Sequence, residues 1–171
     1  MTSIGQGRFL WLVEDGGWEY VMRRNVGPNG VVAVVAMTDE RKLLLVEQFR
    51  KPVGKWVIDI PAGLVDDRET VSKAAARELL EETGYSGSPI SVLGAVPTSP
   101  GLTNEVVTIV WAGNTTKTND VVGVDGEAIT VHEISIPGLR SWLTAKMFQG
   151  CLIDPKVYTG LVLARLYSPR L

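Results

Sequence analysis

The chain has 171 residues, 45% of them hydrophobic, a net charge of −2 and one cysteine. This length predicts a single domain over residues 1–171, and the slight negative charge gives no electrostatic reason to expect a nucleic acid or an acidic membrane as partner. One cysteine excludes an internal disulfide and a cysteine-rich zinc site. The sequence contains no run of 18 apolar residues, so it predicts no membrane span. The start, MTSIGQGRFLW, lacks a signal-peptide pattern, so we expect a cytoplasmic protein.

The first part of the chain predicts strands. Alternating or β-branched runs end at polar or glycine-containing turns, which is typical of hairpins. The predicted strands cover residues 8–13, 18–24, 31–37, 42–48 and 57–60. The first two form an N-terminal hairpin within residues 1–27, and this segment alone could be an appendage. After the last of them Pro61 forces a turn.

The strongest helix prediction covers Thr70–Thr83, where alanines fill the middle and Gly84 stands at the position that a helix C-terminus prefers. The second half alternates strands and helices. We expect strands at 90–96, 105–112 and 128–134, a polar loop at 113–127, and helices at 138–147 and 155–167. The order predicts an α+β fold, a mixed sheet with helices on it.

Three acids crowd the end of the predicted helix: Glu78, Glu81 and Glu82. At about 100° per residue they lie within one arc of the helix. Like charges at this spacing destabilise a helix by a few tenths of a kcal/mol per pair, but a bound divalent cation reverses that effect. Mg²⁺ prefers such oxygen ligands. The alternative is an ordinary solvated glutamate face.

The wider spacing around these acids is distinctive. Gly63 is followed after five residues by Glu69, and after seven more by the run RELLEETGY at 77–85. This pattern resembles the signature of the Nudix hydrolase family at every specified position. The resemblance implies an α/β/α sandwich around a mixed sheet and hydrolysis of a diphosphate linked to a further group.

The resemblance also implies roles for residues in this box. Glu78 and Glu82 would be metal ligands, joined by the backbone carbonyl of Ala62, and Glu81 would be a ligand or a near neighbour. The metal would be Mg²⁺, with Mn²⁺ as a substitute. The structural residues of the box would be Gly63, Glu69 and Arg77, with the two charged side chains holding the loop and the helix together.

Residues outside the box bear on the substrate. The stretches Glu47–Arg50 and Asp59–Gly63 resemble the ADP-ribose pyrophosphatase and nucleoside-diphosphate-sugar hydrolase branch, although Asp59 stands where that branch often has glutamate. Pro100 lies 16 residues past Gly84, a spacing typical of that branch. An ordinary Pro-Gly turn is the alternative. The predicted substrate-binding residues are Arg50, Pro100, Gly101, Glu105 and Trp18.

An acidic loop before the strand at 128–134 offers candidates for the general base. By resemblance, Asp125 is a base candidate and Glu127 a metal ligand. Glu127 could carry both duties, or Glu81 could be the base, and the alternative is a solvated loop. His132 is expected to be structural and Cys151 a packed thiol.

The sequence therefore predicts an enzyme for a small-molecule nucleotide sugar. It would hydrolyse ADP-ribose or a related compound to a nucleoside monophosphate and a sugar phosphate, with Mg²⁺. The alternatives are GDP-mannose, UDP-glucose or dinucleoside polyphosphates as substrates, or a non-catalytic nucleotide-sugar sensor. Members of the branch often exchange N-terminal strands between subunits, which implies a homodimer in which Trp18 and Tyr20 could stack on a nucleobase.

Overall fold

The computed structural model describes residues 1–24, 30–119 and 128–167. Its helices are α1 (Val71–Thr83), α2 (Ile136–Phe148) and α3 (Pro155–Tyr167). Its strands are β1 (Thr2–Gln6), β2 (Leu10–Asp15), β3 (Trp18–Arg23), β4 (Val31–Thr38), β5 (Lys42–Arg50), β6 (Lys55–Asp59), β7 (Ala62–Leu64), β8 (Tyr85–Ser86), β9 (Ile90–Pro97), β10 (Val106–Lys117), β11 (Ile129–Ser135) and β12 (Leu152–Ile153).

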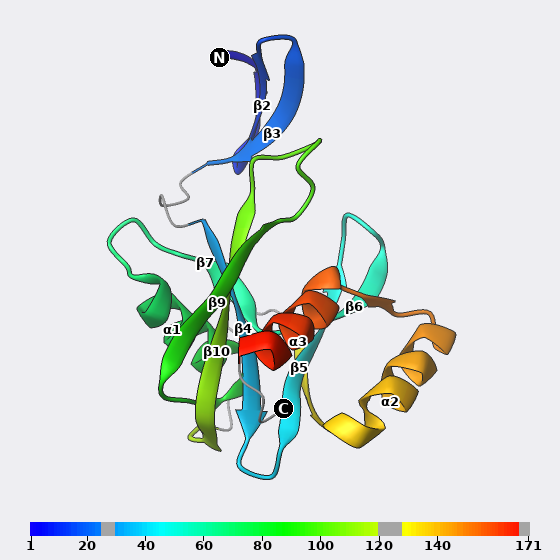
Figure 1. Cartoon of the computed structure of the whole chain (residues 1–171). Helices are drawn as coiled ribbons and strands as arrows, with labels where there is room; N and C mark the ends of the chain where they lie inside the picture. Colours follow the sequence, from blue (N-terminus) through cyan, green and yellow to red (C-terminus); the bar gives the residue numbers. More distant parts are fainter. Residues whose placement is uncertain (25–29, 120–127, 168–171) are drawn as a thin grey trace.

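A mixed sheet forms the body of the protein, with the order β12-β6-β5-β4-β10-β8. β11 also pairs with β5, β9 with β10, and β7 with β4. The central pair β4 and β10 is parallel, whereas β5 runs antiparallel to β4. Figure 1 shows the helices lying over this sheet and a smaller sheet projecting from one end.

The two faces of the sheet bury different helices because successive side chains of a strand point to opposite sides. In β4, Val32 and Val34 pack in the cluster that contains Leu79 of α1. Val35 of the same strand packs in the other cluster, with Val157 of α3. This layering confirms the expected α/β/α sandwich.

Local sequence explains the ends of α1. The Thr70 side chain accepts a hydrogen bond from the backbone N–H of Lys73 (3.3 Å), which caps the first turn. Gly84 ends the helix in the left-handed conformation with φ 75°, which glycine adopts without strain. The helix occupies Val71–Thr83, so the predicted helix is confirmed, with Thr70 as the N-cap and not as its first residue.

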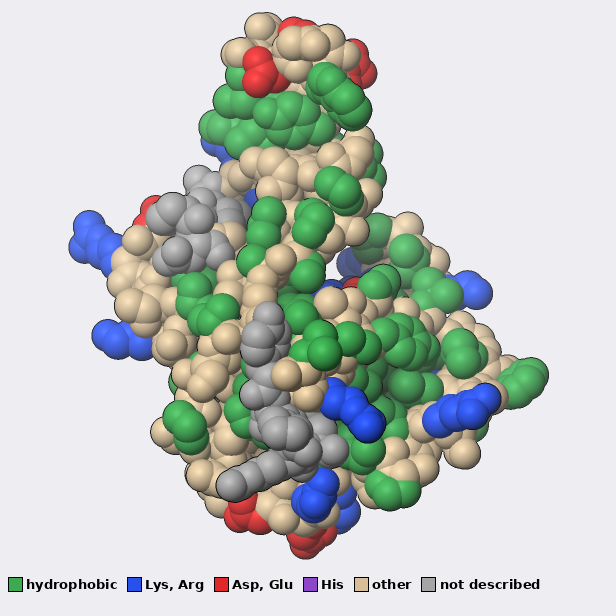
Figure 2. All heavy atoms as spheres, in the orientation of Figure 1, with side chains coloured by type: hydrophobic (Ala, Val, Ile, Leu, Met, Phe, Trp, Pro, Cys, Tyr) green, Lys and Arg blue, Asp and Glu red, His purple; other side chains and the backbone are tan. Residues whose placement is uncertain are grey.

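The N-terminal segment forms a separate three-stranded sheet, β1-β2-β3. The hairpin of β2 and β3 was predicted, but β1 was not. The sheet meets the body at the β9–β10 loop, where the backbone N–H of Val21 donates to the carbonyl of Leu102 (2.8 Å). Figure 2 shows hydrophobic side chains gathered on the part of the molecule that this sheet forms.

The remaining differences from prediction concern short elements and boundaries. β7, β8 and β12 have only two or three residues each, too few to show a periodic pattern. β10 continues to Lys117, so it takes up the start of the loop expected at 113–127, and residues 120–127 lie outside the described part. In the described ranges, no helix is long and apolar enough to cross a membrane.

Candidate active site

A cavity of about 700 Å³ opens where the N-terminal sheet meets the body. Its walls come from the end of β3, the start of β4, the end of β5 and the loop after it, the turn between β6 and β7 with its flanking residues, the helix α1, the β9–β10 loop with the start of β10, and the start of α3. The lining residues are Arg23, Val31, Arg50, Pro52, Asp59, Ala62, Gly63, Leu64, Glu78, Glu82, Thr98, Glu105, Val107, Asp154 and Lys156.

Two glutamates of α1 form the acidic wall of the cavity. Glu78 and Glu82 lie one turn apart, and both are largely buried, at 9% and 8% exposure. The backbone N–H of Ala62 donates to Glu82 Oε2 at 3.0 Å, so the turn before β7 is attached to the helix at this point. The structure therefore brings together the three residues that the sequence predicts as metal ligands within the box.

Gly63 leaves room for the carboxylate of Glu78. A Cβ atom at residue 63 would lie 2.0 Å from Glu78 Oε1, closer than any non-bonded contact allows. A glycine lets the backbone pass directly beside the carboxylate. The spacing between Gly63 and the acids of the helix thus reflects a close approach of chain to helix.

Burial disfavours the charged form of both glutamates. It raises the pKa of Glu82 to about 8, to which the neighbouring carboxylates of Glu78 and Asp59 also contribute, while the Ala62 N–H and Arg50 act in the opposite direction. Burial also raises the pKa of Glu78, against the effect of Arg77. A divalent cation between these carboxylates would compensate their charge.

The oxygen donors of Glu78, Glu82 and Ala62 fit a hard cation that needs few carboxylate ligands. No cluster of three or more acidic, histidine or cysteine side chains in the described residues is arranged to hold a metal. Two carboxylates and a peptide carbonyl suffice for Mg²⁺, which usually keeps several waters and takes one or two carboxylates. Glu127, the further predicted ligand, and Asp125 lie outside the described residues.

Arg77 contacts three glutamates of the box. Its guanidinium lies 3.0 Å from Glu69, 2.7 Å from Glu78 and 3.1 Å from Glu81, and donates to the backbone carbonyl of Leu64 at 2.9 Å. The contacts to Glu69 and Leu64 tie the segment before α1 to the helix, and those to Glu78 and Glu81 lie within α1. Glu81 takes part in this network and does not line the cavity.

Arg50 faces the same cavity from the last residue of β5. In the described part of the chain its guanidinium has no hydrogen-bond or ion-pair partner, although its charge acts on Glu82. A planar guanidinium can bind two oxygens of a phosphate at once. The arrangement places a group suited to binding phosphate beside two carboxylates suited to holding a cation.

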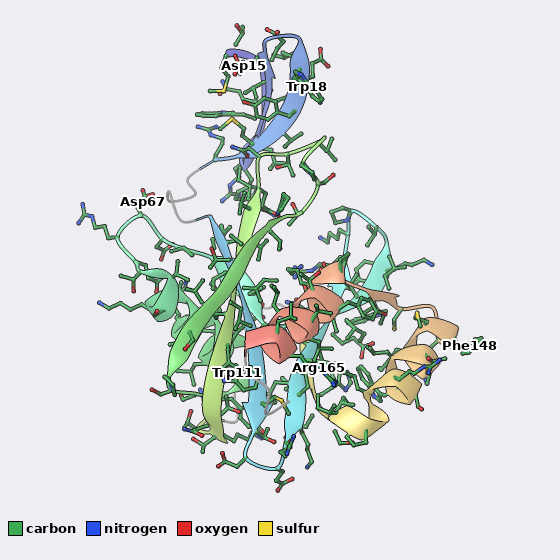
Figure 3. All side chains as sticks on the ribbon, in the orientation of Figure 1. Asp15, Trp18, Asp67, Trp111, Phe148 and Arg165 are labelled. Carbon is green, nitrogen blue, oxygen red and sulfur yellow. The ribbon has the colours of Figure 1, made fainter. Side chains whose placement is uncertain are left out.

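The predicted residues of the β9–β10 loop separate into two groups. Glu105 lines the cavity, forms an ion pair with Arg23 and accepts a hydrogen bond from Thr98 Oγ1 (3.3 Å). Pro100 and Gly101 lie in an exposed turn and do not line the cavity. Trp18 is 67% exposed at the outer end of the N-terminal sheet, away from the cavity of its own chain (Figure 3).

A second polar cluster lies beneath α2, outside the cavity. His132 Nε2 is 2.7 Å and Lys146 Nζ 2.6 Å from Glu47 Oε2. Cys151 is 8% exposed, and its thiol donates to Glu47 Oε1 (3.6 Å). These contacts join β5 and β11 to the end of α2, which agrees with the expected structural role of His132 and the expected packing of Cys151.

Sequence reasoning missed three charged residues of the cavity: Arg23, Asp154 and Lys156. None belongs to the box; Asp154 directly precedes α3 and Lys156 lies in its first turn, far along the chain. One signal was available for Lys156, because a lysine in the first turn of a helix opposes the helix dipole and calls for an acidic partner. For Arg23 no sequence signal exists, since its partner Glu105 is distant in sequence.

Fold and cavity define a class: an α/β/α sandwich in which two buried glutamates of a helix line a cavity beside an arginine. A family model described as NUDIX domain matches residues 28–150. The chain belongs to the Nudix family, which confirms the membership that the box predicts.

Individual relatives match at moderate identity. The chain is 36% identical to "Methanol dehydrogenase activator" of Bacillus methanolicus over 125 residues, 72% of this chain and 68% of that protein. It is 43% identical to "ADP-ribose pyrophosphatase" of Bacillus subtilis over 90 residues, 53% of this chain and 49% of that protein. A solved structure titled "Crystal structure of ADP compounds hydrolase" superposes with a TM-score of 0.73 at 20% identity, covering 96% of this chain and 89% of that one, which shows the shared fold.

Proposed function

We propose that this protein is a pyrophosphohydrolase that cleaves the diphosphate of ADP-ribose or a related nucleoside diphosphate sugar. The observation that carries the proposal is one cavity in which Glu78, Glu82 and Ala62 stand beside Arg50. A relative bearing the name ADP-ribose pyrophosphatase supports the substrate class. The products would be a nucleoside monophosphate and a sugar phosphate, AMP and ribose 5-phosphate in the case of ADP-ribose.

We infer that Mg²⁺ is the cation, with Mn²⁺ as a substitute. Glu78, Glu82 and the carbonyl of Ala62 would hold it. When bound, the cation neutralises charge on the diphosphate and makes a water more acidic. Arg50 binds the diphosphate from the other side and holds its reacting phosphorus in place, which lowers the entropic part of the barrier.

Water attacks one phosphorus in line, and the other phosphate leaves. The attacking water must pass its proton to a carboxylate within hydrogen-bond reach. Glu81 is engaged by Arg77 outside the cavity, which makes it the weaker base candidate. Asp125 and Glu127 are therefore our preferred candidates, and Glu127 could serve as both base and ligand.

We also propose a homodimer formed through the N-terminal sheet. Several apolar side chains of this sheet are largely exposed, among them Ile4 (50%), Phe9 (66%) and Trp18 (67%). Burial of this surface against a second copy would remove it from water and bring Trp18 near the partner's cavity. Sedimentation equilibrium tests the proposal: a monomer at micromolar concentration would contradict it.

The function is tested by product release from a substrate panel. ADP-ribose, GDP-mannose, UDP-glucose and diadenosine polyphosphates are compared with Mg²⁺ and with EDTA. We expect Mg²⁺-dependent cleavage, fastest with ADP-ribose. Preference for another nucleotide sugar would retain the chemistry and change the substrate, whereas no turnover of any compound would favour the sensor alternative.

A further inference from the structure

The start of α3 contributes a charged cluster to the cavity, separate from the acidic wall of α1. Lys156 lies in the first turn of the helix, Asp154 directly precedes it, and Asp59 ends β6. All three line the cavity. Neither the box nor the predicted substrate residues include Asp154 or Lys156, so this wall of the site has no role assigned by the sequence.

The three side chains form a compact network. Lys156 Nζ lies 2.9 Å from Asp59 Oδ2 and 2.7 Å from Asp154 Oδ2. Asp59 is 6% exposed, Lys156 16% and Asp154 27%, so the network becomes more open towards Asp154. Asp59 Oδ1 also accepts the backbone N–H of Ile60 (2.8 Å). Asp59 thus holds Lys156 at the buried end of the network.

Hydrogen-bonding capacity remains on the open side. An ammonium group has three N–H donors, and two of those on Lys156 point to carboxylates. No third partner of the ammonium occurs in the described residues. Asp154 accepts from the ammonium and from the backbone N–H of Lys156 (2.9 Å), which leaves lone pairs of its carboxylate unused. A donor and an acceptor therefore stand side by side on the cavity wall.

The position of this pair is fixed by the fold. The backbone N–H of Asp154 donates to the carbonyl of Ile58 in β6 (2.9 Å). Further along α3, a Cβ atom at Gly160 would lie 2.7 Å from Val35 Cγ2, so only a glycine allows the helix to pack this close to the sheet. A rigidly held donor–acceptor pair loses little entropy when a ligand binds.

The charge of the cluster indicates what kind of group it binds. Two carboxylates and one ammonium give a net charge of −1 when all are ionised. Burial raises the pKa of Asp59 to about 6, while the ammonium group of Lys156 acts in the opposite direction. A phosphate would meet repulsion from the two carboxylates, whereas Arg50 offers a cation that has no ion-pair partner among the described residues. Neutral hydroxyl groups, which both donate and accept, fit an adjacent carboxylate and ammonium.

We propose that Asp154 and Lys156 bind the hydroxyl groups of the sugar attached to the diphosphate, so that the start of α3 determines sugar specificity. Asp59 acts through Lys156 as a positioning residue. The inference rests on the proposed function. It assigns the sugar to the α3 end of the cavity and the diphosphate to the space between Arg50 and the acidic wall.

The test compares substrates that differ in one part only. ADP-ribose is compared with the pentyl ester of ADP, which keeps the adenosine and the diphosphate diester but lacks the terminal ribose, and with IDP-ribose, which changes the base. The main variant is Asp154→Asn, which keeps an oxygen to accept the Lys156 N–H but removes the charge. We expect kcat/KM for ADP-ribose to fall at least about tenfold, as for loss of a hydrogen bond to a charged group.

The same variant should change kcat/KM for the pentyl ester by less than about twofold, because that substrate lacks the hydroxyls of the terminal ribose. The ratio between ADP-ribose and IDP-ribose should remain unchanged. Asp39→Asn, in the exposed tip between β4 and β5, is the matched control and should alter none of the three values.

A second variant avoids leaving a buried charge unpaired. Asp59→Asn with Lys156→Met removes both partners of the inner ion pair, and thermal unfolding verifies that it folds. The same selective loss on ADP-ribose supports the inference. An equal loss on ADP-ribose and the pentyl ester, or a changed base preference, overturns it while the proposed function stands. If wild type cleaves no ADP-ribose at all, the proposed function fails and this inference with it.

Discussion

Replacing Glu82 by glutamine tests the contribution of this carboxylate to metal binding separately from its effect on folding stability. Glutamine keeps an oxygen to accept the Ala62 N–H but cannot ionise. In the metal-free protein, the pKa of Glu82 rises from the ordinary 4.5 to about 8 because the side chain is buried. Between these values the folded state holds a proton that the unfolded state has released, so the free energy of unfolding falls as pH rises through this interval.

The size of this effect follows from the two pKa values. Each pH unit between them changes stability by about 1.4 kcal/mol. From 4.5 to pH 7, about 2.5 units, Glu82 lowers the stability of the metal-free wild type by about 3 kcal/mol. Glu82→Gln should therefore be more stable than wild type in EDTA at pH 7, by up to about this amount, and similar to it near pH 4.5.

The assay is urea unfolding followed by tryptophan fluorescence, in EDTA and in Mg²⁺. At a concentration 100 times its Kd, Mg²⁺ stabilises wild type by about 2.7 kcal/mol, and it should stabilise Glu82→Gln much less. Activity should fall at least about a hundredfold in kcat. Glu19→Gln, an exposed change of equal charge on β3, is the control and should behave as wild type.

Three outcomes would refute this reasoning. If Glu82→Gln is no more stable than wild type in EDTA at pH 7, burial does not disfavour the charged carboxylate. If Mg²⁺ stabilises both proteins equally, Glu82 is not a ligand. A loss of activity below about threefold in a folded variant would also exclude a metal-ligand role.

Three further predictions address the other candidate site residues. Arg50→Ala should lower kcat/KM at least about tenfold and leave the affinity for Mg²⁺ unchanged. Kinetics with a parallel metal titration tests this, and an unchanged kcat/KM with weaker Mg²⁺ binding would contradict it. Gly63→Ala should displace the Glu78 carboxylate, since the added Cβ would lie 2.0 Å from it, and weaken binding of Mn²⁺ measured by electron paramagnetic resonance; wild-type affinity would show that the chain adjusts without loss. Asp125→Asn and Glu127→Gln should each slow kcat if this loop supplies the base, and intact rates in both would place the base elsewhere.

Much of the fold could be predicted because its signals are local. The sequence predicts a helix at Thr70–Thr83 from its alanines and from Gly84 at its end, which are neighbours in sequence, and the structure forms it over Val71–Thr83. The hairpin of β4 and β5 likewise follows from two apolar runs around a polar tip. Strands of two or three residues, such as β8 and β12, carry no such pattern, and their pairing depends on strands elsewhere in the chain.

The sequence by itself determined the acidic helix and the family of the protein, because the box is a fixed spacing of residues within one segment. Only the tertiary structure decided that Glu82 is buried beside Ala62, that Arg77 holds Glu81 out of the cavity, and that Lys156 reaches Asp59. The physical reason is that burial and long-range contacts depend on how the sheet brings distant segments together. The spacing along the chain identifies the candidate ligands. The packing of distant segments determines how strongly their charged forms are disfavoured, which groups they contact, and which residues form the wall that we propose for the sugar.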